Sequence, residues 1–169
     1  MEDAILDCLR HGMVLTHLKV QPGECIAVKG TVPPDAKSFA LNMGRAGSDL
    51  ALHFNPQFES HGDARIIICN SLQGGEWGEE QREPDFPFQL GQDAKICISF
   101  DAQELTVALP GEQQLKFPNR LGLEAIEFFS MEGDFRVKSI KFKWLLPFPA
   151  GSSPSLLAPP PPWGAKTYQ

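Results

Sequence analysis

Residues 50–58 read LALHFNPQF, and their alternation of apolar and polar side chains decides the fold class. One parity holds Leu50, Leu52 and Phe54. The other parity holds Ala51, His53 and Asn55. Successive side chains of a β-strand point to opposite faces of the sheet. The stretch therefore predicts a strand with one apolar face toward a core and one polar face directed away from it.

The same period of two recurs between residues 13 and 144. Further apolar residues that alternate with more polar ones are Ile96, Ile98, Phe100, Leu105, Val107 and Leu109. Residues 65–70 are apolar on both parities, which is typical of a strand with neighbours on both sides. The alternation slips between Val137 and Ile140, which indicates a β-bulge or a kink.

Turn-forming residues separate these runs. They are Pro22-Gly23, Pro33-Pro34-Asp35, Gly74-Gly75, Pro110-Gly111 and Gly133-Asp134. No segment between residues 13 and 144 has a long helical period. Many short antiparallel strands around one core predict an all-β sandwich or jelly roll, and the alternation alone does not choose between the two.

Composition divides the chain into one domain and two extensions. It has 169 residues, of which 42% are hydrophobic, enough for one domain with a packed core. We expect residues 1–12 to be an N-terminal extension and 13–144 to be the domain. Seven of the fifteen prolines follow residue 144, so 145–169 are predicted to be a flexible Pro-rich tail. The alternative for its APPPPW segment is docking into a proline-recognition groove.

Charge and cysteine spacing exclude several classes of function. The net charge of −6 argues against nucleic acid as a partner. No apolar stretch reaches the length that membrane insertion needs. The start, MEDAILDCLRHGM, lacks the basic and apolar regions of a signal peptide, so we expect synthesis in the cytoplasm. Four cysteines without a CxxC pair predict reduced thiols, no zinc site and no cofactor.

Polar side chains gather around the first strand in a pattern that suits a sugar. His53, Asn55 and Gln57 would line one face about 7 Å apart. Candidates that follow in the chain are His61, Asp63, Asn70, Trp77, Glu80 and Arg82. An aromatic ring can stack on the apolar side of a pyranose while polar groups bind its hydroxyls. A solvated sheet face with an ordinary surface tryptophan is the alternative.

These residues lie in motifs that resemble the carbohydrate-recognition domain of the galectins. The motifs are HFNPQF, HGDA, ICNS, WGEEQRE and FPNRLGLEAI, with PGEC and DAKSFALN before them. The resemblance runs from about Met13 to Trp144 and is to the single-domain, prototype members. It implies a jelly roll of two antiparallel sheets with a shallow concave groove. It also implies binding to β-galactosides of glycoproteins or glycolipids, without a cofactor.

The resemblance further implies a role for each matching position. His53 and Asn55 would contact the axial O4 of galactose, Asn70 and Glu80 would hold O6, and Trp77 would stack under the ring. A second group would reach beyond galactose. Glu80 and Arg82 would face the next sugar, His61 and Asp63 would border that subsite, and Ser38 would extend the groove.

Gln57 departs from the family pattern, which has arginine at this position. The arginine donates to O4 and neutralises the glutamate that matches Glu80, whereas glutamine is shorter and uncharged. Losing a charge-assisted donor costs about 1.5–3 kcal/mol, or roughly ten- to hundredfold in affinity. We expect weakened galactoside binding, partly offset by pairing of Arg82 with Glu80. The alternative is a galectin-related protein that has lost sugar binding and acts as an interaction module.

Other functions find less support. Glu79 and Glu80 are adjacent and would point to opposite faces, so they cannot flank one glycosidic bond, and we expect no enzyme activity. A metal site from His53, His61 and Asp63 lacks the usual ligand spacing. Prototype galectins form twofold homodimers through their terminal strands, and the two extensions are expected to weaken that contact. The family's export without a signal peptide leaves an extracellular location open.

Overall fold

The computed structural model describes residues 12–60 and 63–144, which form twelve strands and one short 3-10 helix. The first six strands are β1 Met13–Leu15, β2 Glu24–Thr31, β3 Phe39–Ala46, β4 Asp49–Ser60, β5 Asp63–Gln73 and β6 Glu76–Trp77. The others are β7 Gln81–Glu83, β8 Asp93–Phe100, β9 Glu104–Ala108, β10 Gln114–Pro118, β11 Phe128–Gly133 and β12 Arg136–Trp144. The helix, η1, spans Pro110–Glu112 between β9 and β10.

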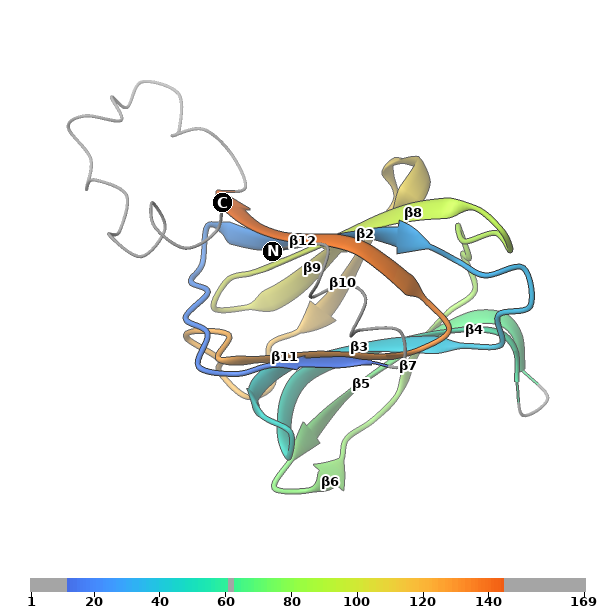
Figure 1. The fold of residues 1–169 in the computed structure, drawn as a ribbon. Helices are drawn as coiled ribbons and strands as arrows, with labels where there is room; N and C mark the ends of the chain where they lie inside the picture. Colours follow the sequence, from blue (N-terminus) through green and yellow to red (C-terminus); the bar gives the residue numbers. More distant parts are fainter. Residues whose placement is uncertain (1–11, 61–62, 145–169) are drawn as a thin grey trace.

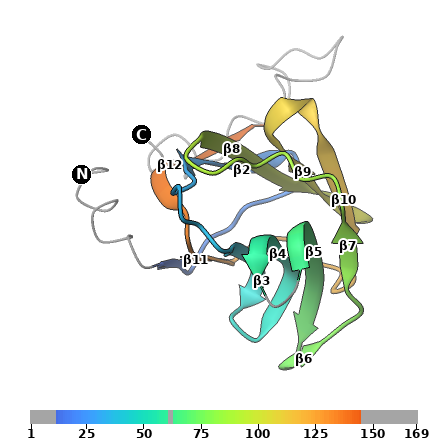
Figure 2. The same cartoon turned by 90° about the vertical axis from the view of Figure 1, so that its right-hand side faces the viewer.

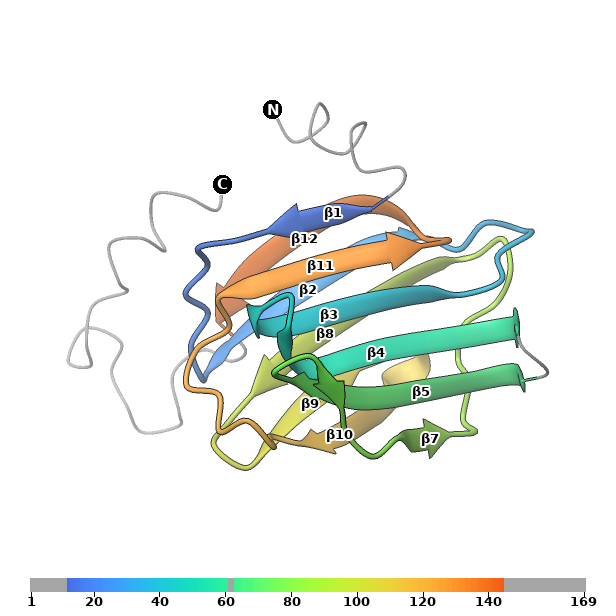
Figure 3. The same cartoon turned by 90° about the horizontal axis from the view of Figure 1, so that it is seen from below.

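Two antiparallel sheets stack as the upper and lower layers of Figures 1 and 2. The seven-stranded sheet has the order β1-β11-β3-β4-β5-β6, with β7 also paired to β5. The five-stranded sheet has the order β10-β9-β8-β2-β12. The expectation of a jelly-roll β-sandwich is confirmed. Strands β1 and β12, from the two ends of the domain, are edge strands at the same side of the molecule (Figure 3).

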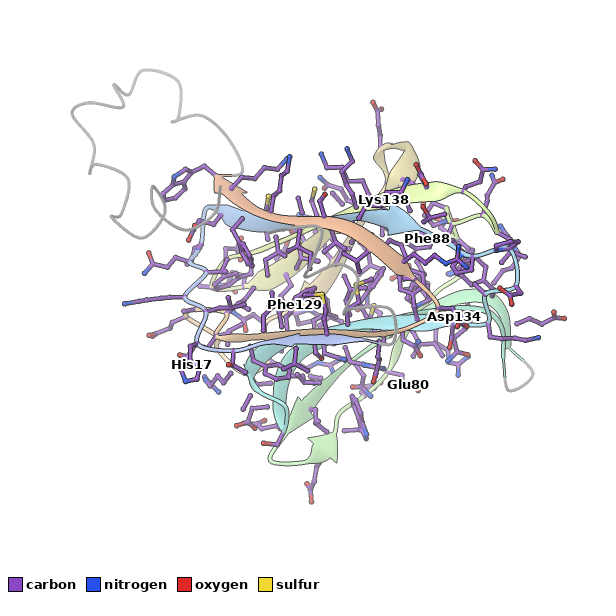
Figure 4. The ribbon with its side chains drawn as sticks, viewed as in Figure 1. His17, Glu80, Phe88, Phe129, Asp134 and Lys138 are labelled. Carbon is purple, nitrogen blue, oxygen red and sulfur yellow. The ribbon has the colours of Figure 1, made fainter. Side chains whose placement is uncertain are left out.

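Apolar side chains from both sheets fill the space between the layers, where Figure 4 shows Phe129. The core between the sheets includes the residues that the alternation predicted to point inward: Ile96, Ile98, Phe100, Leu105, Val107 and Leu109. A cluster of phenylalanines packs behind β4. The ring of Phe39 lies 4.8 Å from Phe135 and 5.4 Å from Phe88, measured between centroids. These rings support the strand that carries the polar row.

Two predictions about individual strands are also confirmed. The pairing of β12 with β2 shifts between Val137 and Ser139, which places the expected bulge at Lys138. Strand β5 has β4 on one side and β6 and β7 on the other, so its doubly apolar stretch lies inside the sheet. The predicted turns fall between strands or at their ends.

The alternation prediction fails at the start of β4. The core contains Ala51 together with Leu52 and Phe54, whereas Leu50, although buried, is not part of it. The cause is a bulge, because the register of β4 shifts against both β3 and β5 in this region. Gly44 permits the close approach, since a Cβ atom there would collide with the carbonyl oxygen of Asp49. From Leu52 onward the predicted parity holds.

The described cysteines are free thiols. Cys25 and Cys97 lie on neighbouring strands, and the hydrogen bond from Cys25 lowers the pKa of Cys97 to about 6. Burial raises the pKa of Cys69 to about 12. Within residues 12–60 and 63–144, no three metal-ligating side chains come together, and no helix is long and apolar enough to cross a membrane.

We predict that Phe39→Ala lowers the free energy of unfolding by about 3–5 kcal/mol, because it opens a cavity in the ring cluster. Phe39 is only 1% exposed. Leu90→Ala is the matched control, because Leu90 is 46% exposed and its truncation should cost less than about 0.5 kcal/mol. Urea unfolding of both variants measures the difference. Equal losses would show that the ring cluster does not support the sheet.

Candidate functional site

A row of polar side chains follows β4 on the outer face of the seven-stranded sheet. Leu52, Phe54 and Phe58 point into the core, so His53, Asn55 and Gln57 point outward, as predicted. The strand continues through Pro56, which pairs with Ile67 of β5. The three polar side chains therefore form one continuous line.

His53 is held from the side by a chain of hydrogen bonds to the neighbouring strands β3 and β11. Asn42 on β3 donates from Nδ2 to Ser130 Oγ at 3.1 Å and presents its Oδ1 to His53 Nδ1 at 2.5 Å. A carbonyl oxygen can only accept, so Nδ1 carries the proton and the other ring nitrogen, Nε2, is left as an acceptor. Burial lowers the pKa of His53, opposed in part by the charge of Glu132. The ring is therefore neutral at pH 7.

Trp77 stands beside His53 and is the main exposed apolar surface of the site. It pairs with Leu72 across the β5–β6 turn and is 55% exposed. Its ring centroid lies 5.0 Å from that of His53, with 59° between the planes. An exposed aromatic face next to a hydrogen-bond acceptor forms a corner that fits a ring with one apolar and one polar side.

The segment that carries Trp77 is braced by Arg120. Its Nη1 donates to Glu79 O at 2.9 Å and to Ser71 Oγ at 3.1 Å, and its guanidinium lies 4.6 Å from the Phe117 ring centroid. Gly78 makes this brace possible, because a Cβ atom there would stand 3.0 Å from Nη1.

Asn70 links the brace to the row. It lies directly opposite His53 in the β4–β5 pairing. Its Nδ2 donates to Gly78 O at 3.0 Å, and its Oδ1 accepts from the backbone amide of Ser71 at 2.7 Å. The buried amide is thus fixed, with one Nδ2 hydrogen left for a ligand.

Asn55 and Gln57 use much of their hydrogen-bonding capacity on each other and on the backbone. Asn55 Nδ2 donates to Phe39 O at 2.8 Å, and Gln57 Nε2 donates to Asn55 Oδ1 at 2.9 Å. The buried Gln57 Oε1 has no hydrogen-bond partner among the described residues. The Nε2 donor of Gln57 is therefore already engaged within the protein, while its Oε1 acceptor is unsatisfied.

Glu80 and Arg82 lie at the exposed rim of the site, where Figure 4 labels Glu80. Arg82 Nε is 3.3 Å from Glu80 Oε1, which is the pairing expected from the sequence. Arg82 is placed next to the polar row because it pairs with Ile68, which in turn pairs with Asn55. The charge of Glu80 is therefore compensated by Arg82.

The remaining candidates are placed less completely. Ser38 precedes β3 and forms an isolated bridge with Gln57, so it lies at the far end of the row. His61 falls outside the described residues. Asp63 begins β5 opposite Ser60, but its side chain is not among those described.

Sequence reasoning missed three residues that hold the binding side chains in place: Asn42, Ser130 and Arg120. Asn42 was visible as a polar residue between Leu41 and Met43, on the parity opposite the core. Arg120 stands in the FPNRLGLEAI motif without an assigned role. Its contact with Asn70 at 3.5 Å joins positions fifty residues apart, which alternation cannot reveal.

Comparisons with known proteins agree with this architecture. The family model described as galactoside-binding lectin matches residues 12–142. A 16 kDa beta-galactoside-binding lectin of Gallus gallus is 54% identical over 134 residues, covering 79% of this chain and 99% of the relative. Galectin-1 of Ovis aries is 53% identical over 132 residues, covering 78% of this chain and 98% of the relative.

Solved structures give the same result. A homodimeric agglutinin from chicken liver superposes with a TM-score of 0.76 at 55% identity, covering 78% of this chain and 99% of that one. Toad ovary galectin in complex with thio-digalactose superposes with a TM-score of 0.75 at 41% identity, covering 79% and 98%. The chain therefore belongs to the galactoside-binding lectins, the galectin family.

Proposed function

We infer that this protein is a lectin that binds β-galactosides on the outer face of its seven-stranded sheet. The observation that carries the inference is the fixed acceptor of His53 beside the exposed ring of Trp77. The relatives at about half identity are named as β-galactoside-binding lectins, which supports the same ligand class. A module without sugar binding is not favoured. Since the family is one of lectins, we propose binding without hydrolysis.

Each side chain has a part in the proposed binding. The axial O4 hydroxyl donates to His53 Nε2, and the free Nδ2 hydrogen of Asn55 donates to the same oxygen. Asn70 and Glu80 hold O6, and the ring of Trp77 lies under the apolar face of galactose. Arg82 and Glu80 meet the next sugar. Ser38, His61 and Asp63 extend the groove.

The replacement of arginine by Gln57 is proposed to weaken this binding. The donor of Gln57 is already engaged by Asn55 Oδ1. A hydroxyl that competes for it would break an existing hydrogen bond to gain a new one, which leaves little net free energy. Arg82 already neutralises Glu80. The absence of the family's arginine at position 57 should therefore weaken the contact to O4 more than it changes the charge around Glu80.

We predict that Gln57→Arg raises the affinity for lactose about ten- to hundredfold, corresponding to about 1.5–3 kcal/mol from a charge-assisted donor. Gln57→Leu is the control of similar size without a donor, and it should change the affinity less than about threefold. Isothermal calorimetry of the three proteins measures the effect. The proposal fails if the protein and its arginine variant bind lactose equally tightly.

The lactose affinity should also depend on the protonation of His53. The pKa of His53 lies below its ordinary value of 6.5, so the ring is neutral at pH 7 and accepts from O4. As the pH falls through this lowered pKa, Nε2 gains a proton and its acceptor role is lost. We predict constant affinity above pH 7 and a fall below the ordinary histidine range.

Asn42→Asp tests this assignment, because a carboxylate at Nδ1 raises the pKa of His53. The midpoint of the affinity profile should move to higher pH, and NMR of the imidazole nitrogens should show the same shift. Lys19→Ala, on the exposed loop before β2, is the control and should leave the profile unchanged. An unchanged midpoint in Asn42→Asp would show that His53 is not the titrating group.

We further propose that two copies pair through the edge strands β1 and β12, as a solved relative is a homodimer. A dimer would present two sites and strengthen binding to the glycans of glycoproteins or glycolipids by avidity. We propose that the protein is made in the cytoplasm and then exported, so that it can meet such glycans outside the cell.

In the sequence, the extension of residues 1–12 directly precedes β1, and the extension of residues 145–169 directly follows β12. We predict that a chain trimmed to residues 13–144 has the larger dimer fraction, because the extensions interfere with pairing. Light scattering at matched concentrations compares it with the full chain. Equal dimer fractions would contradict the prediction.

A further inference from the structure

Lysines gather on the outer face of the five-stranded sheet, on the side of the molecule opposite the sugar site. Ile26 and Val28 of β2 point into the core, so Lys29 points outward. Cross-strand pairing brings the other outward lysines beside it. The lysine face consists of the exposed residues Lys29, Lys95, Lys141 and Lys143.

Nearby anions offset the positive charge of this face only in part. The hydrogen bond from Thr31 and, more weakly, the charge of Lys29 lower the pKa of Asp93. The hydrogen bond from Cys25 and, more weakly, the charges of Lys95 and Lys143 lower the pKa of Cys97. The acidic residues Asp93 and Glu104 are held by other lysines, Lys138 at 3.0 Å and Lys116 at 2.7 Å. Within residues 12–60 and 63–144, no ion pair involves the four residues of the lysine face. This concentration of cations stands out in a chain with a net charge of −6.

Two of these lysines oppose each other directly. Lys29 and Lys95 are register partners on β2 and β8, a placement in which like charges destabilise a sheet. Lys141 and Lys143 follow on the edge strand β12, about 7 Å apart. A bound chain of anions would relieve the repulsion in the pair and neutralise the lysines beyond it.

The lysine face is a stripe in which the lysines are separated by small side chains. Small side chains lie between the lysines, since Lys141 pairs with Ala27 and Lys143 with Cys25. Trp144 follows Lys143 at the end of β12, on the parity opposite to Lys141 and Lys143, and is 47% exposed. Its ring lies over Gly23, where a Cβ atom would be 3.5 Å away. The stripe thus has cations along its length and small side chains between them.

We propose that the lysine face binds a linear sulfated polysaccharide. Lysine ammonium groups bind sulfates as compact point charges, and their alignment in a stripe suits an extended chain of such anions. An anionic bilayer fits less well, because none of the exposed large hydrophobic residues among those described points outward from the strands of this face. A single-stranded nucleic acid would need several stacking rings.

The two ligands would occupy opposite sheets. Figure 4 places Lys138, next to the lysine face, at the upper sheet and Glu80 at the lower one. Binding of a sulfated chain should therefore not compete with lactose. This independence also separates the proposal from the function of the galactoside site.

The test is calorimetry of the full chain with a heparin octasaccharide at several salt concentrations, in saturating lactose. We expect binding that weakens as salt rises and is absent with the desulfated octasaccharide. Lys141→Ala/Lys143→Ala should lower the affinity at least tenfold. It should also reduce the salt slope by about 1.4, from roughly 0.7 per lost contact.

Lys19→Glu is the matched control, because it changes the net charge by the same two units away from the lysine face. It should bind the octasaccharide like the unmodified protein and leave lactose binding intact. Competition by lactose, or equal losses in both variants, would overturn the proposal. Binding to phosphatidylserine vesicles without binding to the octasaccharide would also overturn it, in favour of a membrane.

Discussion

The register of β4 between β3 and β5 is the constraint on which the rest of the site depends. It directs Phe54 and Phe58 into the ring cluster and His53 to the opposite face. A slip of one residue would bury the polar row and expose the aromatic rings. The inter-sheet core therefore fixes the binding face through the free energy of apolar burial. The bulge near Ala51 ends before the row begins, so the row keeps its alignment.

Hydrogen bonds along the outer face of the sheet turn this face into an organised site. Ser130 and Asn42 set the tautomer of His53, and Arg120 holds the segment that carries Trp77. A shallow site gains affinity when its groups are ordered before the ligand arrives, because less side-chain entropy is lost on binding. Gln57 acts in the opposite direction, since its donor is occupied before any sugar is present.

Alternation of side chains was sufficient to predict the all-β fold, the polar row and the irregularity between Val137 and Ile140, because each is a local property of a strand. It failed at Leu50, where the register shift is set by the neighbouring strands. It also missed the brace by Arg120, which depends on the packing of segments distant in sequence. Motif resemblance supplied the choice of a jelly roll and the roles of Asn70 and Trp77, which spacing alone does not specify.

The lysine face gives the molecule two chemically different sides, one that offers hydrogen-bonding side chains and another that is basic. The central claim concerns the first side, and NMR titration of the protein with lactose tests it most directly. The account predicts that the indole signal of Trp77 and the side-chain amide signals of Asn55 and Asn70 shift progressively and together. Unchanged signals at these three residues in excess lactose, or shifts confined to the five-stranded sheet, would contradict it.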